Sequence, residues 1–252
     1  MNDRALLASD EASPVEVAGP GDSRFVVVCD HAGREIPRRL ATLGVSDEDL
    51  RTHIAWDLGA AGLARRLAAE LEAQVFLQRY SRLVIDCNRP LSAPDSIPAA
   101  SGGVAIPANQ QLSRADAEAR ITAIFTPYHA AIRAALDQRE RYILVTVHSF
   151  TPELHGVKRP MHAGVLYERD ARLATPLLAL LREDPELSVG DNEPYAASVE
   201  TDYAIIEYGE RCGVPYVELE VRQDLLTDEA GQALWASRLA RLLRIASGPF
   251  RF

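Results

Sequence analysis

Four short polar clusters in the sequence carry residues that could bind a metal ion or move a proton. They are Asp30-His31-Ala32-Gly33, the stretch from His53 to Asp57, the stretch from Tyr80 to Pro90, and His148-Ser149 together with the later Glu218, Glu220 and Arg222. Each cluster follows a predicted strand or begins a predicted helix. Ligands of open α/β sheets bind outside the carboxyl ends of the strands. We therefore expect these clusters to meet at one edge of a sheet.

Two histidines at strand ends, an acidic third ligand and one further glutamate satisfy the needs of a catalytic zinc site. Such a site uses three protein ligands and keeps an open position for water. The ion would lower the pKa of that water to roughly 7 and polarise an amide carbonyl, and the glutamate would carry the proton. A lone histidine such as His31 is more often a structural residue, so this interpretation depends on the clusters meeting in space.

The third cluster contains adjacent amide and guanidinium groups, Asn88 and Arg89. An arginine fork can hold a carboxylate through two hydrogen bonds, which suits an anionic substrate in an acidic protein. The alternative is that Arg89 anchors a loop by pairing with Asp86.

Three charged side chains share one face of the predicted strand at 216–221, because side chains alternate along a strand. They are Glu218, Glu220 and Arg222. A carboxylate crowded by a second one and by a cation can act as a general base, or can belong to a structural ion-pair network. The pattern leaves both interpretations open.

These clusters need a scaffold, and the hydrophobic pattern predicts one. It predicts strands at 25–29, 75–77, 83–85, 142–147, 163–167 and 216–221, and helices from Ser46 to Leu71 and at 113–140 (bent at Pro127), 171–183, 198–212 and 229–246. Alternating strands and helices predict an α/β fold with a mostly parallel or mixed central sheet and helices on both faces. We divide the chain into a flexible lead, 1–22, and a single catalytic domain, 23–252. The long loop at 90–107 has the length of a functional lid.

Composition limits the function further. The 252 residues carry a net charge of -9, which favours solubility and argues against a nucleic-acid groove. An anionic substrate would therefore have to meet a local basic pocket. We expect no membrane span and no export signal, and the three cysteines without a CxxC pair fit a reducing cytoplasm. A second enzyme hypothesis makes Cys29 or Cys87 a nucleophile activated by His31. A third hypothesis makes the protein a binding module without catalytic turnover. Whether the chain forms a homo-oligomer is left open.

The sequence resembles the N-formylglutamate amidohydrolase family from about Phe25 to Leu242. The matching stretches are CDHAGREIP at 29–37, HIAWDLGA at 53–60, YSRLVIDCNRP at 80–90, VTVHSFTPELHG at 145–156, VGDNEPY at 189–195 and ELEVRQDL at 218–225. The resemblance implies the phosphorylase/hydrolase-like fold of the zinc carboxypeptidases and aspartoacylases. It also implies hydrolysis of N-formyl-L-glutamate to formate and glutamate, or of another acyl amino acid or short amide.

Carried over by motif, the resemblance implies a role for each candidate residue. It implies zinc, or another divalent transition metal, held by His31, Asp57 and His148, with Glu220 as the general base. Whether Glu218 shares the base role stays open. Asn88 and Arg89 would grip the substrate carboxylate, with Arg82 and Arg222 as supporting cations. Glu35 is the rival to Asp57 as the acidic ligand, and we prefer Asp57 because it precedes the helical stretch beginning at Leu58. His53, His162 and Tyr195 are candidates for the pocket wall.

Overall fold

Seven strands build a mixed central sheet in a computed structural model that describes residues 5–154 and 156–250. In spatial order the strands are β1 (Val15–Ala18), β3 (Gln74–Gln78), β2 (Phe25–Cys29), β6 (Ile143–Phe150), β11 (Tyr216–Arg222), β9 (Ala163–Leu166) and β10 (Val189–Asp191). The four strands β3, β2, β6 and β11 are parallel, whereas β1 and β9 run antiparallel to β3 and β11. The predicted mostly parallel or mixed sheet is confirmed.

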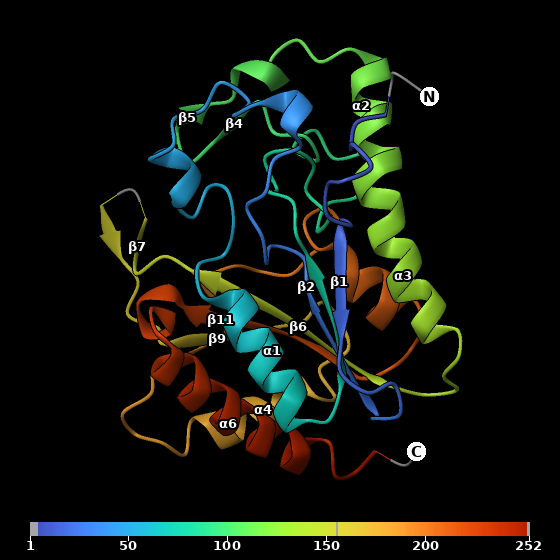
Figure 1. Cartoon of the computed structure of the whole chain (residues 1–252). Helices are drawn as coiled ribbons and strands as arrows, with labels where there is room; N and C mark the ends of the chain where they lie inside the picture. The colour runs from blue at the N-terminus through green and yellow to red at the C-terminus, as the bar shows by residue number, and fades with distance from the viewer. Residues whose placement is uncertain (1–4, 155, 251–252) are drawn as a thin grey trace.

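Helices cover both faces of this sheet, as predicted (Figure 1). One face packs against α1 (Ala60–Glu70), α4 (Ala174–Leu181) and α6 (Glu229–Ala246), and the other against α2 (Arg114–Arg120), α3 (Thr126–Leu136) and α5 (Tyr203–Ile205). Strand β2 serves both cores: Val27 and Cys29 point to the first face, and Val26 and Val28 to the second. A strand covered on both sides must be apolar throughout, which is why this run shows no alternation.

Short elements fill the connections. They are the 3-10 turns η1 (Arg38–Leu40), η2 (Asp49–Arg51), η3 (Pro107–Asn109) and η6 (Gln223–Leu226), the π-helical turns η4 (Ile121–Phe125) and η5 (Ile206–Glu210), and the hairpins β4 (Ala100–Ser101) with β5 (Val104–Ala105) and β7 (Glu153–Leu154) with β8 (Val157–Lys158). The predicted loop at 90–107 therefore contains the β4–β5 hairpin.

The predicted start of the first helix, at Ser46, was wrong. Ser46 and Asp49 do cap each other, because the Asp49 N–H donates to Ser46 Oγ at 3.1 Å and the Ser46 hydroxyl donates back to the carboxylate at 2.6 Å. That cap serves only η2, and the long helix α1 begins at Ala60. The intervening chain is irregular, and there the Asp57 N–H donates to the carbonyl of His31.

The strand predicted at 83–85 was also wrong. Leu83, Val84 and Ile85 are buried, but Leu83 and Val84 lie in a turn and Ile85 follows it in irregular structure. Their carbonyls find side-chain donors in place of a neighbouring strand: Asn109 Nδ2 donates to Leu83 and Arg120 Nη1 to Val84, at 2.8 and 2.9 Å. A buried apolar run therefore predicted burial here without predicting a strand.

The other predicted elements are present with shifted limits. The helix predicted at 113–140 is α2, η4 and α3 in succession, so a π-helical turn precedes Pro127. The helix predicted at 198–212 begins only at Tyr203 and continues as η5. The final helix has the predicted limits, 229–246.

Part of the predicted N-terminal lead has a place in the sheet, since β1 pairs with β3. The Tyr80 hydroxyl also donates to the Ala12 carbonyl at 3.0 Å. The division of the chain at residue 22 stays a prediction. Among the described residues, no helix combines the length and the apolar character needed to cross a membrane.

Candidate metal centre and the cavity around it

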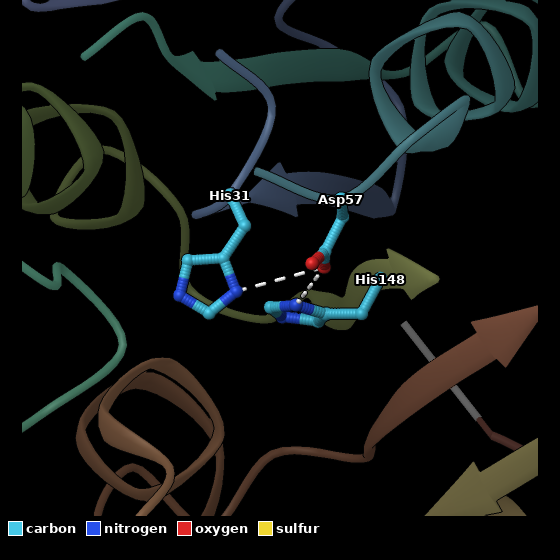
Figure 2. A group of neighbouring side chains, drawn as sticks. All are labelled: His31, Asp57 and His148. Carbon is cyan, nitrogen blue, oxygen red and sulfur yellow. Dashed lines mark hydrogen bonds and ion pairs between the residues drawn. The ribbon is translucent and has the colours of Figure 1, made fainter. Parts of the chain in front are cut away.

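Three side chains predicted as metal ligands meet beyond the carboxyl ends of the central strands (Figure 2). His31, Asp57 and His148 each offer one ligand atom, and these atoms lie within 4.8 Å of one another. Asp57 Oδ2 is 3.5 Å from Nδ1 of His31 and 2.9 Å from Nδ1 of His148. All three side chains are buried, so an ion there would be shielded from bulk water on the protein side.

The fold brings these residues together from distant parts of the sequence. His31 stands two residues beyond the end of β2, and His148 lies near the end of β6, the next strand in the sheet. Asp57 reaches them from the irregular segment before α1, where its N–H donates to the His31 carbonyl at 2.9 Å. Gly59 then turns the chain into α1 with a φ of 80°, a left-handed conformation that favours glycine.

The donor set fits a divalent transition metal such as zinc. Nε2 of His31 lies 2.7 Å from Oδ1 of the buried Asp86. A carboxylate there keeps the ring proton on Nε2 and leaves the Nδ1 lone pair free, which is the usual outer support of a metal-binding histidine. Two imidazole nitrogens and one carboxylate oxygen facing a common cavity also leave room for a fourth, open position.

Neighbouring charges hold the carboxylates of this centre ionised. Burial alone would raise the pKa of Asp57, but the Arg82 guanidinium, which donates to Asp57 Oδ1, and His31 lower it well below its ordinary value. Burial likewise opposes ionisation of Asp86, whereas His31 lowers its pKa. Arg82 therefore acts on Asp57 directly.

A cavity of about 320 Å³ opens beside the three residues. Among the predicted residues its wall includes Asn88, Arg89, His53, Tyr195, Glu218 and Glu220. The wall also contains Thr201 and Asp202, for which the sequence held no signal, because they lie in a stretch predicted as helix.

Glu220 sits in the cavity wall opposite His148, its register partner on the neighbouring strand β6. The residue is 6% exposed, and its Oε2 has no hydrogen-bond partner among residues 5–154 and 156–250. Burial raises the pKa of Glu220 well above its ordinary value, and His148 opposes this shift. The carboxylates of Asp57 and Glu218 add to it. Glu220 is thus a carboxylate poised to take up a proton.

Asn88 and Arg89, which also line the cavity, are held in place by neighbouring groups. The Oδ1 of buried Asn88 accepts the N–H groups of Tyr203 and Ala204, at the start of α5, which leaves its amide nitrogen as a donor. Arg89 donates to the carbonyl of Thr201 and, through Nε, to the Asp95 carboxylate at 3.0 Å. Arg89 therefore anchors a loop while it lines the cavity. Burial opposes the charge of its guanidinium, whereas the Asp86 and Asp95 carboxylates raise its pKa above the ordinary value.

Three other predicted residues lie elsewhere. Arg222 donates to Asp224 and to the carbonyls of residues 159 to 161, and it is outside the wall of this cavity in the described part of the chain. Glu35 is exposed and lines a different pocket, next to Trp56 and Arg79. His162 accepts the Ser188 N–H through Nδ1. We therefore leave all three out of the site.

The cysteines give no support to a thiol nucleophile. Cys29 and Cys87 are buried in the two cores, 0% and 1% exposed, and burial raises the pKa of both thiols well above the ordinary value. A buried neutral thiol behaves as a small apolar side chain.

Comparisons with known proteins identify the family and the fold. A family model, N-formylglutamate amidohydrolase, matches residues 23–227. A gene product of known structure from Agrobacterium tumefaciens is 34% identical, with a TM-score of 0.92 over 96% of this chain and 98% of that one. The N-formylglutamate amidohydrolase from Ralstonia eutropha is 22% identical, with a TM-score of 0.66 over 94% of this chain and 98% of that one, which shows a shared fold. A search among curated proteins gave no match. The chain belongs to the N-formylglutamate amidohydrolase family.

Proposed function

We propose that this protein is a metal-dependent amidohydrolase that cleaves the amide bond of an N-acyl amino acid, with N-formyl-L-glutamate as the leading substrate. The observation that carries the proposal is the group of His31, Asp57 and His148, whose ligand atoms lie within 4.8 Å of one another beside a cavity. The family match supports the reaction class, and it is the reason for testing the formyl substrate first.

In the proposed reaction, water adds to the acyl carbon and the carbon–nitrogen bond breaks. A zinc ion held by the three residues would polarise the amide carbonyl and acidify the attacking water. Glu220 takes the proton from that water and delivers it to the departing nitrogen, which is the general acid–base role its raised pKa suits. The products are a carboxylic acid, formate in the leading case, and the free amino acid.

Substrate binding falls to other residues of the cavity wall. We assign the substrate carboxylate to Asn88 and Arg89, because they present an amide and a guanidinium side by side. Arg82 keeps the Asp57 carboxylate ionised and oriented through its hydrogen bond. A formyl group offers little to recognise, so selectivity must come from the amino-acid part.

The test combines elemental analysis of the purified protein with a product-release assay across N-formyl, N-acetyl and N-carbamoyl amino acids. We expect about one transition-metal ion per chain, release from N-formyl-L-glutamate, and loss of release after chelation. Release from a different member of the panel would keep the reaction class and change the substrate. Binding of an acyl amino acid without any release, in metal-loaded protein, would refute an enzymatic role.

A further inference from the structure

The second ring nitrogen of His148 faces two buried carboxylates that the proposed reaction does not use. Nε2 lies 3.8 Å from Oδ2 of Asp30 and 3.8 Å from Oε2 of Glu218. Asp30 directly follows β2 and Glu218 belongs to β11, the two strands on either side of β6. None of the three side chains is more than 3% exposed. The imidazole is thus enclosed by negative charge from both neighbouring strands.

Most of these polar atoms are unsatisfied. Within the described ranges, Nε2 of His148 and both carboxylate oxygens of Asp30 have no hydrogen-bond partner. Glu218 is held in place by Thr146, whose hydroxyl donates to Oε2 at 3.1 Å. A buried polar group without a partner costs free energy of folding. A cluster of such groups therefore suggests a functional role that outweighs its cost in stability.

His31 and His148 differ in how closely a carboxylate approaches their Nε2 atoms. Nε2 of His31 lies 2.7 Å from Asp86, within hydrogen-bond distance, whereas the two carboxylates near His148 lie at ion-pair distance. In both cases Nδ1 is the nitrogen turned toward Asp57. A ring that gives Nδ1 to a metal must carry its proton on Nε2.

We propose that Asp30 and Glu218 are positioning residues for His148, and this inference rests on the proposed metal-dependent function. Their negative charge favours the tautomer with the proton on Nε2 and increases the electron density that Nδ1 offers to a metal. They therefore strengthen metal binding through His148.

This inference separates two glutamates that share one strand face. Glu218 is in register with Thr146, one pair deeper in the sheet, and Glu220 is in register with His148. Glu218 therefore supports the metal through His148, while Glu220 faces the reacting atoms. Replacing Glu218 should weaken metal binding, and replacing Glu220 should leave metal binding intact.

Asp30 gives the more distinctive prediction because its two effects have opposite signs. Asp30→Asn keeps the shape and removes a buried charge that has no hydrogen bond. The metal-free variant should therefore melt no lower than metal-free wild type, although its zinc affinity falls. A residue with a merely structural role would instead lower the melting temperature and leave zinc affinity unchanged.

The experiment measures zinc dissociation constants by competition with a chromophoric chelator, and melting temperatures with and without zinc. We expect Asp30→Asn and Glu218→Gln to bind zinc about 10- to 100-fold more weakly, with kcat restored by excess zinc. Glu220→Gln is the matched control on the same strand and should keep wild-type zinc affinity. A second control, Glu210→Gln, removes a carboxylate that Tyr216 of β11 donates to at 2.5 Å, and should lower stability only.

Wild-type zinc affinity in both Asp30→Asn and Glu218→Gln would overturn this inference and leave the proposed function standing. A lower melting temperature of metal-free Asp30→Asn at unchanged zinc affinity would assign Asp30 a structural role and overturn it as well. If the wild-type protein binds no transition metal, the proposed function fails, and this inference fails with it.

Discussion

Among single residues, Glu220 is the carboxylate to which we assign proton transfer. Glu220→Gln keeps the size of the side chain and removes its ability to accept a proton. We expect kcat to fall on the order of 10²- to 10⁴-fold, the usual contribution of a general acid–base group. Steady-state kinetics with matched zinc content would measure this, and near-wild-type kcat in zinc-loaded Glu220→Gln would remove the assignment.

Arg89 is assigned to the substrate carboxylate, and Arg222 offers a matched control. Both are arginines with carbonyl and carboxylate partners, but only Arg89 lines the cavity. Arg89→Ala should raise KM about 10- to 100-fold, the value of a charged hydrogen bond. Arg222→Ala should leave KM near wild type. Circular dichroism would check folding, and equal KM changes in the two variants would contradict the placement of the carboxylate.

The sequence pointed to the three candidate metal ligands better than to the residues that support them. His31 and His148 stand at strand ends, where polar residues after apolar runs are conspicuous. Asp30 precedes His31 at the end of β2, and Asp86 lies in the irregular segment after Val84. No spacing rule tells which of several adjacent polar groups turns toward a histidine ring. Their contacts depend on how three strands and a loop pack, and only the structure provides that.

At the scale of elements, the turn before α1 carries Asp57 into the site. Gly59 adopts a φ of 80°, and a Cβ there would lie 2.6 Å from the carbonyl oxygen of Leu226. Gly103 is the matched control, since its φ is 83° but no atom lies within 4 Å of a built Cβ. The two positions thus share backbone strain and differ in crowding.

We expect Gly103→Ala to lower the free energy of unfolding by about 1 kcal/mol, because left-handed backbone disfavours a Cβ. Gly59→Ala should lose about 1–3 kcal/mol more from crowding, and its zinc affinity should fall as Asp57 shifts. Urea denaturation measures the free energy of unfolding of the two variants, and zinc titration measures their zinc affinity. Equal stabilities in the two variants would show that the turn tolerates crowding.

Local signals predicted some elements well and misjudged others for identifiable reasons. The last helix began and ended as predicted, because Asp228 caps it by accepting the Gly231 N–H at 2.8 Å and its apolar positions repeat regularly. The strand predicted at 83–85 was wrong because side chains far along the chain, Asn109 and Arg120, donate hydrogen bonds to two of its carbonyls. Tertiary hydrogen bonds of this kind leave no trace in a local pattern.

At the scale of the whole molecule, a buried neutral histidine ties helix α3 to the loop that carries Asn88. His129 lies with Nε2 3.1 Å from the Cys87 carbonyl and Nδ1 2.8 Å from the Tyr208 hydroxyl. The carbonyl can only accept, so Nε2 donates to it and Nδ1 accepts from the tyrosine. Burial lowers the pKa of His129 to about 3, so the folded protein resists its protonation.

Acid should therefore destabilise the fold through His129. Above its ordinary pKa of 6.5 the residue is neutral in both states, and its neutral contacts contribute fully. Between 6.5 and about 3 only the unfolded chain takes up the proton, so stability falls by up to about 1.4 kcal/mol per pH unit. His129→Gln should show a shallower decline in urea unfolding between pH 7 and 4. Identical slopes would assign the acid sensitivity to other groups.

The overall architecture followed from the order of strands and helices, but the antiparallel placement of β1 and β9 did not. Both are short strands at or near the ends of the sheet, where pairing direction depends on how connections return rather than on local composition. The consequence for function is small, because His31, His148 and Glu220 all come from the parallel centre of the sheet or its continuation.

The most direct test of the central claim is anomalous X-ray scattering at the zinc absorption edge from crystals of the zinc-loaded protein. We predict one strong peak at about 2.0–2.2 Å from Nδ1 of His31, Nδ1 of His148 and a carboxylate oxygen of Asp57. A peak coordinated by other side chains, or no peak at these three residues in zinc-loaded crystals, would contradict it.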